Sequence, residues 1–327
     1  MRVLITGGAG FIGSHLTETF LSLGHHVSCV DDLSTGSLDN LSSVREHPNL
    51  LLYEDTIFNT RLTSELVDEA DVIFHLAAAV GVKRIVDFPV QTIETNVEGT
   101  EIVLDAAAKT GKRIFVASTS EVYGKSTKIP FSETDDLVLG STYNSRWAYA
   151  CSKAMDEFLA FAYFREHNLP VTIVRFFNTV GPRQTGRYGM VLPTFVRQAL
   201  LNEPLTVYGT GAQSRCFGHV ADIVNGLLLL LECDRAPGEI FNLGNTEEVT
   251  IEQLARKVIA ACESNSEIVH ISYSDAYGPG FEDMFRRVPD LSKAREWVGY
   301  QPRYSLNDII RSVVDYERMV MAARQVA

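Results

Sequence analysis

A tyrosine and a lysine that share one helix face are the residues of this chain best suited to chemistry. Tyr149 and Lys153 stand four positions apart within a helical pattern over 148–167, so both side chains project from one face. A tyrosine is an effective base only if its pKa falls from about 10 toward neutrality, a change of about 4 kcal/mol. An ammonium about 5 Å away supplies roughly 3 kcal/mol at an effective dielectric near 20. The pair predicts a base that needs one more positive charge nearby.

A second group of reactive side chains follows an apolar run over 113–117. There Thr119, Ser120 and Glu121 come directly after the expected strand end. A hydroxyl of Thr119 or Ser120 is suited to holding the oxygen from which Tyr149 takes a proton. Glu121 completes the group with a carboxylate.

A glycine cluster near the N-terminus predicts a dinucleotide site. Gly7, Gly10 and Gly13 follow the apolar run Val3–Thr6 with the spacing G-x-x-G-x-x-G, and a helical pattern comes next. Glycines there allow a tight turn and close approach to a pyrophosphate at the helix N-terminus. Asp31-Asp32 ends the second expected strand, where a carboxylate accepts hydrogen bonds from ribose hydroxyls and repels a 2′-phosphate. The cofactor expected is NAD, whose oxidised ring supplies the positive charge that Tyr149 needs. The alternative is a structural turn followed by a solvated acidic pair.

Strands that alternate with helices must position these residues. The expected strands are Val3–Thr6, His26–Val30, Val72–Leu76, Arg113–Ala117 and Val171–Phe176, and the expected helices include 94–109 and 148–167. This alternation predicts an α/β fold, a Rossmann-type doubly wound parallel sheet with helices on both faces. Loops with Gly and Pro become frequent after about residue 177. We expect residues 1–176 to form the NAD-binding domain and 177–327 a smaller C-terminal substrate lobe, with a strand near 239–243 returning to the first sheet.

The composition narrows the possible partners and the compartment. The chain has 327 residues and a formal net charge of −12, which argues against nucleic acid or an anionic membrane as a partner. Its five cysteines are widely spaced and lack a C-x-x-C pair, so we expect no metal site and no disulfide framework. The N-terminal apolar run is too short for a signal peptide, and no stretch approaches a membrane span. These features favour the cytoplasm.

Two helical patterns carry more apolar residues than one sheet face needs. They cover Ile93–Ala107 and Met155–Phe161. Packing inside the core is one explanation, and the seam of a homodimer is the other. The sequence leaves both open.

The motifs together resemble those of the extended short-chain dehydrogenases/reductases, in particular the branch of nucleotide-sugar epimerases, dehydratases and decarboxylases. The resemblance covers nearly the whole chain and rests on Thr6–Gly13, Asp31, Asp55–Ile57, His75–Ala78, Asn96, Ser118–Gly124, Tyr149 with Lys153, and Arg175–Arg183. It implies that Asp55 and Ile57 lie near the adenine, and Ala77 and Lys153 near the nicotinamide ribose. The cofactor-binding residues it implies are Gly7, Gly10, Phe11, Ile12, Gly13, Asp31, Asp32, Asp55, Thr56, Ile57, Leu76, Ala77, Ala78, Asn96, Tyr149 and Lys153.

The same resemblance implies a UDP-sugar as substrate, bound by the second lobe. Arg215 and Arg287 resemble arginines that hold the diphosphate and the sugar, and a guanidinium suits phosphate and carboxylate oxygens. Asn178 resembles a residue near the diphosphate, and Pro204–Gly209 resembles the segment around the base and ribose. The substrate-binding residues expected are Lys83, Arg146, Asn178, Leu192, Thr206, Tyr208, Arg215 and Arg287.

Three reactions are compared for this site. Ser120-Glu121 stands where similar 4,6-dehydratases carry Asp-Glu, which weakens the interpretation as a dehydratase. The segments 119–124 and 146–151 are instead similar to those of UDP-glucuronic acid decarboxylases. Oxidation at C4 of a uronic acid gives a β-keto acid that loses carbon dioxide readily. In this reading Arg287 holds the carboxylate, and Glu121 manages the proton that later enters C5. The segment 80–84 instead resembles 4-epimerases for UDP-galactose and UDP-glucuronic acid. We expect the decarboxylase, keep the 4-epimerase as the alternative, and place a non-catalytic NAD-sensing scaffold last.

Overall fold

One large parallel sheet organises the protein. The computed structural model describes residues 1–81, 85, 87–186, 189–277 and 282–326. Seven strands lie in the order β11-β6-β5-β4-β1-β2-β3, and every neighbouring pair is parallel. The strands are β1 (Arg2–Thr6), β2 (His26–Asp31), β3 (Leu50–Glu54), β4 (Val72–His75), β5 (Arg113–Thr119), β6 (Val171–Phe176) and β11 (Glu239–Leu243).

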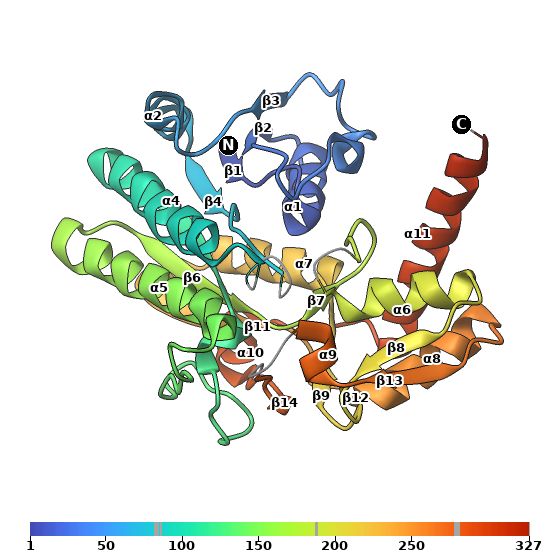
Figure 1. Ribbon diagram of the computed structural model, residues 1–327. Coiled ribbons are helices and arrows are strands. Elements are labelled where there is room, and N and C mark those ends of the chain that lie inside the picture. The colour runs from blue at the N-terminus through green and yellow to red at the C-terminus, as the bar shows by residue number, and fades with distance from the viewer. Residues whose placement is uncertain (82–84, 86, 187–188, 278–281, 327) are drawn as a thin grey trace.

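Helices cover both faces of this sheet (Figure 1). One layer contains α1 (Phe11–Ser22), α7 (Val220–Leu231) and α10 (Ser292–Val298), and the other contains α2 (Thr60–Glu69), α4 (Pro89–Thr110) and α5 (Ala148–His167). Successive strand residues alternate between the layers: Val3 and Ile5 pack in the first, and Leu4 packs in the second. Because both faces are covered, the strands are apolar along their length. The prediction of a doubly wound Rossmann-type sheet is confirmed.

The chain after residue 176 contributes to two places. Strand β11 extends the large sheet by pairing with β6, as expected for 239–243. Helices α7 and α10 cover one face of that sheet. The other segments form a smaller lobe whose core lies between α6 (Val191–Leu200), α8 (Ile251–Cys262) and α11 (Leu306–Val326). Its short strands are β7 (Thr179–Val180), β8 (Leu205–Tyr208), β9 (Ser214–Cys216), β10 (Gly218–His219), β12 (Glu248–Thr250), β13 (Ile268–Ile271) and β14 (Arg286–Arg287), and α9 covers Tyr273–Tyr277. Within the described part of the chain, no helix combines the length and the apolar character needed to cross a membrane.

The topology fixes where a ligand can bind. The strand order reverses between β1 and β4, the place where open α/β sheets leave a crevice at the carboxyl ends of their strands. Two 3₁₀ turns stand at that edge: η2 (Ser120–Tyr123) directly after β5, and η3 (Ser145–Trp147) directly before α5. These connections bring the Thr119–Glu121 group to the same edge as the glycine turn after β1.

Candidate active site

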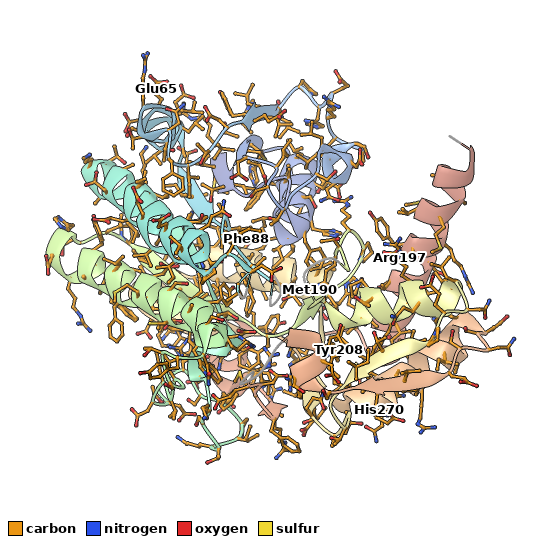
Figure 2. The ribbon with its side chains drawn as sticks, viewed as in Figure 1. Glu65, Phe88, Met190, Arg197, Tyr208 and His270 are labelled. Atoms are coloured by element: carbon orange, nitrogen blue, oxygen red, sulfur yellow. The ribbon has the colours of Figure 1, made fainter. Side chains whose placement is uncertain are left out.

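A cavity of about 450 Å³ lies between the carboxyl edge of the sheet and the smaller lobe. Met190 and Tyr208 line it from the smaller lobe, where the two halves meet (Figure 2). The predicted residues that line it are Gly7, Gly10, Phe11, Ile12, Gly13, Asp31, Asp32, Asp55, Thr56, Ile57, Leu76, Ala77, Ala78, Thr119, Ser120, Glu121, Arg146, Tyr149, Lys153, Asn178, Leu192, Thr206, Tyr208, Arg215 and Arg287. Two predicted residues remain: Lys83 lies outside the described residues, and Asn96 does not line the cavity.

The glycine turn fits a closely approaching pyrophosphate. Gly7 has φ +73°, and a Cβ there would lie 2.9 Å from the backbone nitrogen of Ala77. A Cβ at Gly13 would lie 2.0 Å from the carbonyl oxygen of Gly7. Side chains are therefore excluded at both positions, and α1 begins at Phe11 with its first N–H groups toward the cavity wall. The backbone supplies the anion-binding end that a dinucleotide requires.

Asp31 has the position and hydrogen bonds expected of a ribose-binding carboxylate. It is buried at the end of β2, and its two oxygens accept hydrogen bonds from Ala9 N and Leu33 N, each at 2.9 Å. Burial raises the pKa of Asp31, and these backbone hydrogen bonds oppose the rise. A carboxylate has about four acceptor sites, and the N–H of Gly10 also interacts with this one, so about one site remains for a ribose hydroxyl. The residues present fit NAD.

Asn96 supports the wall of the cavity from behind. It is buried on α4, and its Oδ1 accepts a hydrogen bond from Ala79 N at 2.8 Å. Its Nδ2 donates to Ser152 Oγ at 3.0 Å, one residue before Lys153. Asn96 therefore ties the loop after β4 to α5 through its side chain, without contributing to the surface of the cavity.

Tyr149 and Lys153 on α5 and Thr119 at the end of β5 all line the cavity. Burial raises the pKa of Tyr149, the negative charges of Glu121 and Asp156 add to the rise, and a hydrogen bond with Thr119 opposes it. Lys153 is buried and its Nζ lies 2.6 Å from Asp156 Oδ2. Since that carboxylate neutralises the ammonium, the chain alone does not make Tyr149 a base. A further positive charge at this position is still required, as the spacing argument predicted.

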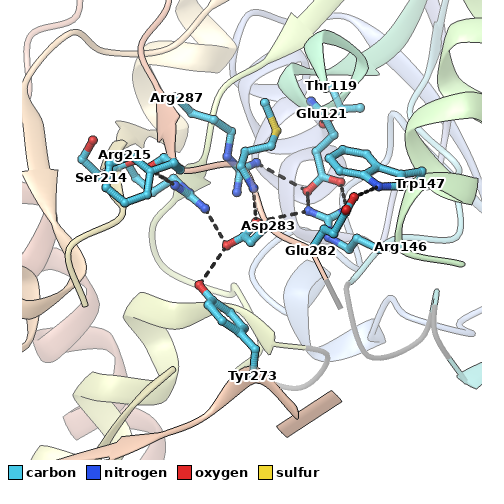
Figure 3. A network of polar contacts seen from close by, with 12 residues as sticks. Thr119, Glu121, Arg146, Trp147, Ser214, Arg215, Tyr273, Glu282, Asp283 and Arg287 are labelled. Carbon is cyan, nitrogen blue, oxygen red and sulfur yellow. Dashed lines mark hydrogen bonds and ion pairs between the residues drawn. The ribbon is translucent and has the colours of Figure 1, made fainter. Parts of the chain in front are cut away.

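Beside the tyrosine lies a buried group of arginines and carboxylates (Figure 3). Both oxygens of Glu121 bind the guanidinium of Arg146, which is only 2% exposed, and Oε1 lies 3.4 Å from Nη1 of Arg287. Burial alone would raise the pKa of Glu121, but the charges of Arg146 and Arg287 outweigh it and hold the pKa below its usual range. Glu121 is therefore a carboxylate at neutral pH.

Asp283 completes this group, and sequence reasoning missed it. Its Oδ2 binds Nη2 of Arg215 at 2.8 Å, and its Oδ1 lies 3.7 Å from Nη2 of Arg146. Parallel pairing of β14 with β9 aligns Arg287 with Arg215 and brings the chain of Asp283 to the cavity. The only local signal was an acidic residue four positions before Arg287. Tyr273, whose hydroxyl lies 3.4 Å from Asp283 Oδ2, also lines the cavity and was not predicted.

The charges of this group do not balance. Three guanidiniums (Arg146, Arg215 and Arg287) face two carboxylates (Glu121 and Asp283), which leaves one positive charge. Burial, together with the charge of Arg215, lowers the pKa of Arg287 to about 10. Its Nε is buried and makes no hydrogen bond within the described part of the chain. The arrangement suits an anionic ligand. Among the described residues, no group of His, Cys, Asp and Glu forms a metal-binding cluster.

Comparison with known sequences gives a consistent result. A sequence model of the GDP-mannose 4,6 dehydratase family matches residues 4–313. The UDP-N-acetyl-alpha-D-glucosaminuronate decarboxylase of Bacillus cytotoxicus is 41% identical over 322 residues, which cover 98% of each chain. UDP-glucuronic acid decarboxylase 1 of Xenopus tropicalis is 37% identical over 317 residues, 97% of this chain and 72% of that protein.

Solved structures agree with the sequence matches. UDP-glucuronic acid 4-epimerase from Bacillus cereus, in complex with UDP-glucuronic acid and NAD, superposes with a TM-score of 0.88 at 28% identity, covering 98% of this chain and 100% of that one. The dTDP-glucose 4,6-dehydratase of Streptomyces venezuelae, with NAD bound, gives 0.89 at 31% identity, covering 99% and 98%. The shared architecture therefore includes both lobes.

Proposed function

On the premise that this chain belongs to the GDP-mannose 4,6 dehydratase family of extended short-chain dehydrogenases/reductases, and is an NAD-dependent nucleotide-sugar enzyme, we propose that it decarboxylates a UDP-linked uronic acid. The relatives named for this reaction act on UDP-glucuronic acid or its N-acetylglucosamine counterpart. UDP-glucuronic acid, giving UDP-xylose or its 4-keto form, was the substrate expected from the sequence. Both uronic acids carry the carboxylate on which the proposal depends.

The observation that carries the proposal is the position of Glu121. It lies after β5 between Arg146 and Arg287, in the cavity that also holds Tyr149. A 4-epimerase needs only a base for the C4 hydroxyl and room for the keto sugar to turn. Decarboxylation additionally needs a cation for the carboxylate and a group that manages the proton entering C5. Arg287 and Glu121 supply these two functions.

Each residue of the cavity has a separate role in the proposed decarboxylation. Thr119 holds the C4 hydroxyl, and Tyr149, assisted by Lys153, takes its proton. NAD, held by the glycine turn and Asp31, would supply the acceptor and later the donor of the hydride at C4. Arg287 orients the carboxylate of the uronic acid, and Arg215 with Asn178 binds the diphosphate. Loss of carbon dioxide leaves an enolate, which takes up a solvent proton at C5 through Glu121, and Tyr149 gives its proton back to the C4 oxygen. With UDP-xylose as the product, the reaction has no net redox change, so the cofactor can stay in its site.

Product analysis tests the proposal. The purified enzyme is incubated separately with UDP-glucuronic acid, UDP-N-acetylglucosaminuronic acid and UDP-glucose, and the products are examined by mass spectrometry and NMR. Loss of carbon dioxide from either uronic acid is the expected result, and UDP-glucose should remain unchanged. A product of unchanged mass with inverted C4 would replace the decarboxylase with the 4-epimerase. An absence of product from all three would leave the non-catalytic reading.

We propose that the protein is a homodimer built on α4 and α5, which lie side by side on one face (Figure 1). Parts of both helices are core, but an apolar set remains exposed. It comprises Phe88 (59%), Val90 (66%), Ile93 (44%), Met155 (47%) and Phe158 (67%). Phe158→Glu should convert a dimer into a monomer in sedimentation experiments, whereas Met319→Glu on α11, equally exposed, should not. A monomeric wild-type protein at micromolar concentration would contradict the proposal.

The cysteines support the cytoplasm as the compartment. All five (Cys29, Cys151, Cys216, Cys233 and Cys262) are free thiols in the structure, and free thiols are typical of proteins in a reducing environment. Cell fractionation with an antibody to the protein tests this placement, and recovery outside the cytoplasm would contradict it.

A further inference from the structure

A buried asparagine on β11 joins two segments that are distant in sequence. Asn242 is fully buried, and its Oδ1 accepts a hydrogen bond from the hydroxyl of Tyr123 at 2.8 Å. Its Nδ2 donates to the carbonyl oxygens of Phe131, at 3.0 Å, and of Asp290, at 3.2 Å. Both N–H groups of the amide therefore face carbonyl oxygens, and its oxygen faces the hydroxyl that can donate, so the three partners fix the orientation of the side chain.

The first of these partners, Tyr123, is close in sequence to Glu121. It lies two residues after Glu121 on the same 3₁₀ turn, η2, and is fully buried. Its ring stacks on that of Phe131, with 4.6 Å between the ring centroids. Because the ring and the hydroxyl are both held, the turn that carries Glu121 has a fixed position against β11.

The other partners are close to Arg287. Asp290 lies three residues after Arg287, and its N donates to the carbonyl oxygen of Phe131 at 2.8 Å. The N of Phe131 donates at 2.8 Å to the carbonyl oxygen of Val288, which directly follows Arg287. The segment after β14 is therefore bound to Phe131, and Asn242 holds both strands of this contact through its Nδ2.

The contact between Glu121 and Arg287 needs support from its surroundings. Glu121 Oε1 and Arg287 Nη1 are 3.4 Å apart (Figure 3), longer than the about 2.7–2.9 Å of a charge-assisted hydrogen bond, so the pair does not set its own separation. In the proposed reaction Arg287 holds the carboxylate on C5, and the proton enters C5 through Glu121. Both groups must therefore stand at set distances from one carbon atom, and an error of about 1 Å can cost up to about 100-fold in rate.

We propose that Asn242 is a positioning residue that fixes the distance between Glu121 and Arg287. The inference rests on the roles proposed above for those two residues. Asn242 and Tyr123 lie outside the cavity wall, so they act on the reaction through the segments that they hold.

The position of this network predicts which step it affects. It joins η2 to the segment after β14, whereas Tyr149 and Lys153 lie on α5. Loss of the network should therefore slow decarboxylation and protonation at C5 more than the oxidation at C4 that precedes them.

A comparison of two buried tyrosines tests this expectation. Tyr123→Phe keeps the ring and removes the hydroxyl that binds Asn242, without changing a charge. Tyr300→Phe is the matched control, because Tyr300 is also fully buried and its hydroxyl donates at 2.8 Å to the carbonyl oxygen of Gly244, just after β11.

Both variants are mixed with the uronic acid that the wild type decarboxylates, and NADH absorbance and carbon dioxide release are followed. Tyr123→Phe should form NADH within about threefold of the wild-type rate but release carbon dioxide about tenfold or more slowly, so that NADH accumulates. Tyr300→Phe should keep the wild-type ratio of the two rates. A hydroxyl that only stabilises the fold would leave this ratio unchanged in both folded variants, and that result overturns the proposal.

A double-mutant cycle tests the hydrogen bond itself. Asn242→Leu removes the amide at similar volume and should also accumulate NADH. If Tyr123 acts through Asn242, adding Tyr123→Phe to the Asn242→Leu protein should cause no further slowing. Additive effects of the two substitutions would overturn the proposal. Should Asn242→Leu fail to fold, the two tyrosine variants decide the question.

Crystal structures of the NAD-bound wild type and Tyr123→Phe separate this inference from the proposed function. The distance between Glu121 Oε1 and Arg287 Nη1 should change by more than about 0.5 Å, the tolerance within which functional groups are held. If no UDP-sugar reduces the bound NAD of the wild type, the proposed function fails, and this distance still decides about Asn242. An unchanged distance overturns the positioning role, whichever sugar the enzyme uses.

Discussion

Replacing Glu121 by Gln should separate the two halves of the reaction. Gln keeps the size of the side chain and one carbonyl oxygen for Arg146, but it removes the charge and the ability to take up a proton. Loss of a group that transfers a proton typically costs about 10²–10⁴-fold in the affected step. Because the Glu121 anion raises the pKa of Tyr149, its removal favours abstraction of the C4 proton. The first step should survive and the later steps should slow.

The assay is absorbance of the enzyme-bound cofactor after mixing with the uronic acid. NADH should accumulate on Glu121→Gln and remain transient on wild type. Stability must be measured beside it, because a buried pair that loses one partner typically costs about 3–5 kcal/mol. Here the cost should fall below that range, since Asp283 lies 3.7 Å from Arg146 and the new amide oxygen still accepts a hydrogen bond.

The matched control is Glu282→Gln. Glu282 binds Trp147 Nε1 at 2.9 Å and Lys125 Nζ at 3.1 Å, next to Asp283 in sequence but outside the cavity wall. It should behave as wild type kinetically. A folded Glu121→Gln enzyme that turns over normally, without accumulated NADH, refutes the role given to this carboxylate and moves the preference to the 4-epimerase.

Three further outcomes are expected. Tyr149→Phe should form neither NADH nor product on addition of substrate, measured by absorbance and mass spectrometry. Gly13→Ala should be purified without cofactor, because the new methyl group would lie 2.0 Å from the carbonyl oxygen of Gly7. Wild-type protein should release NAD on denaturation. Cofactor retained by the variant would contradict this expectation. Glu157→Gln should lower the free energy of unfolding by about 3–5 kcal/mol, because Arg175 binds both Glu157 oxygens in a buried pair, and denaturant titration measures the loss.

Residues whose roles depend on local spacing were predictable from the sequence. Tyr149 and Lys153 are one helical turn apart, and Gly7 to Gly13 occupy the first strand–helix turn. Each group therefore lies within one local element, and its arrangement follows as soon as that element forms. Strand β3 was missed because it is an edge strand with partly exposed residues, among them Leu51 at 52%. Its apolar run carries a weaker signal than a strand covered on both faces.

Residues whose roles depend on distant pairing were not predictable. Asp283 meets Arg215 only because β14 pairs with β9, and no pattern within either segment specifies that register. Asp156 stands three positions after Lys153, a spacing found on the surface of many helices. What distinguishes it is that its ion pair with Lys153 at 2.6 Å is buried, and burial depends on packing against distant parts of the chain.

The return of β11 to the large sheet limits how the protein can fold during synthesis and how it can be expressed as separate fragments. Until residue 243 has left the ribosome, β6 has no partner on one side and offers a row of free backbone groups. Arg113, on β5, likewise has no hydrogen-bond acceptors for its guanidinium until Leu230, Leu231 and Cys233, at the end of α7, supply their carbonyl oxygens. The cofactor-binding half therefore cannot mature during synthesis ahead of the other half. A fragment ending at residue 176 should aggregate when expressed alone, and coexpression with the remaining chain is the way to recover it.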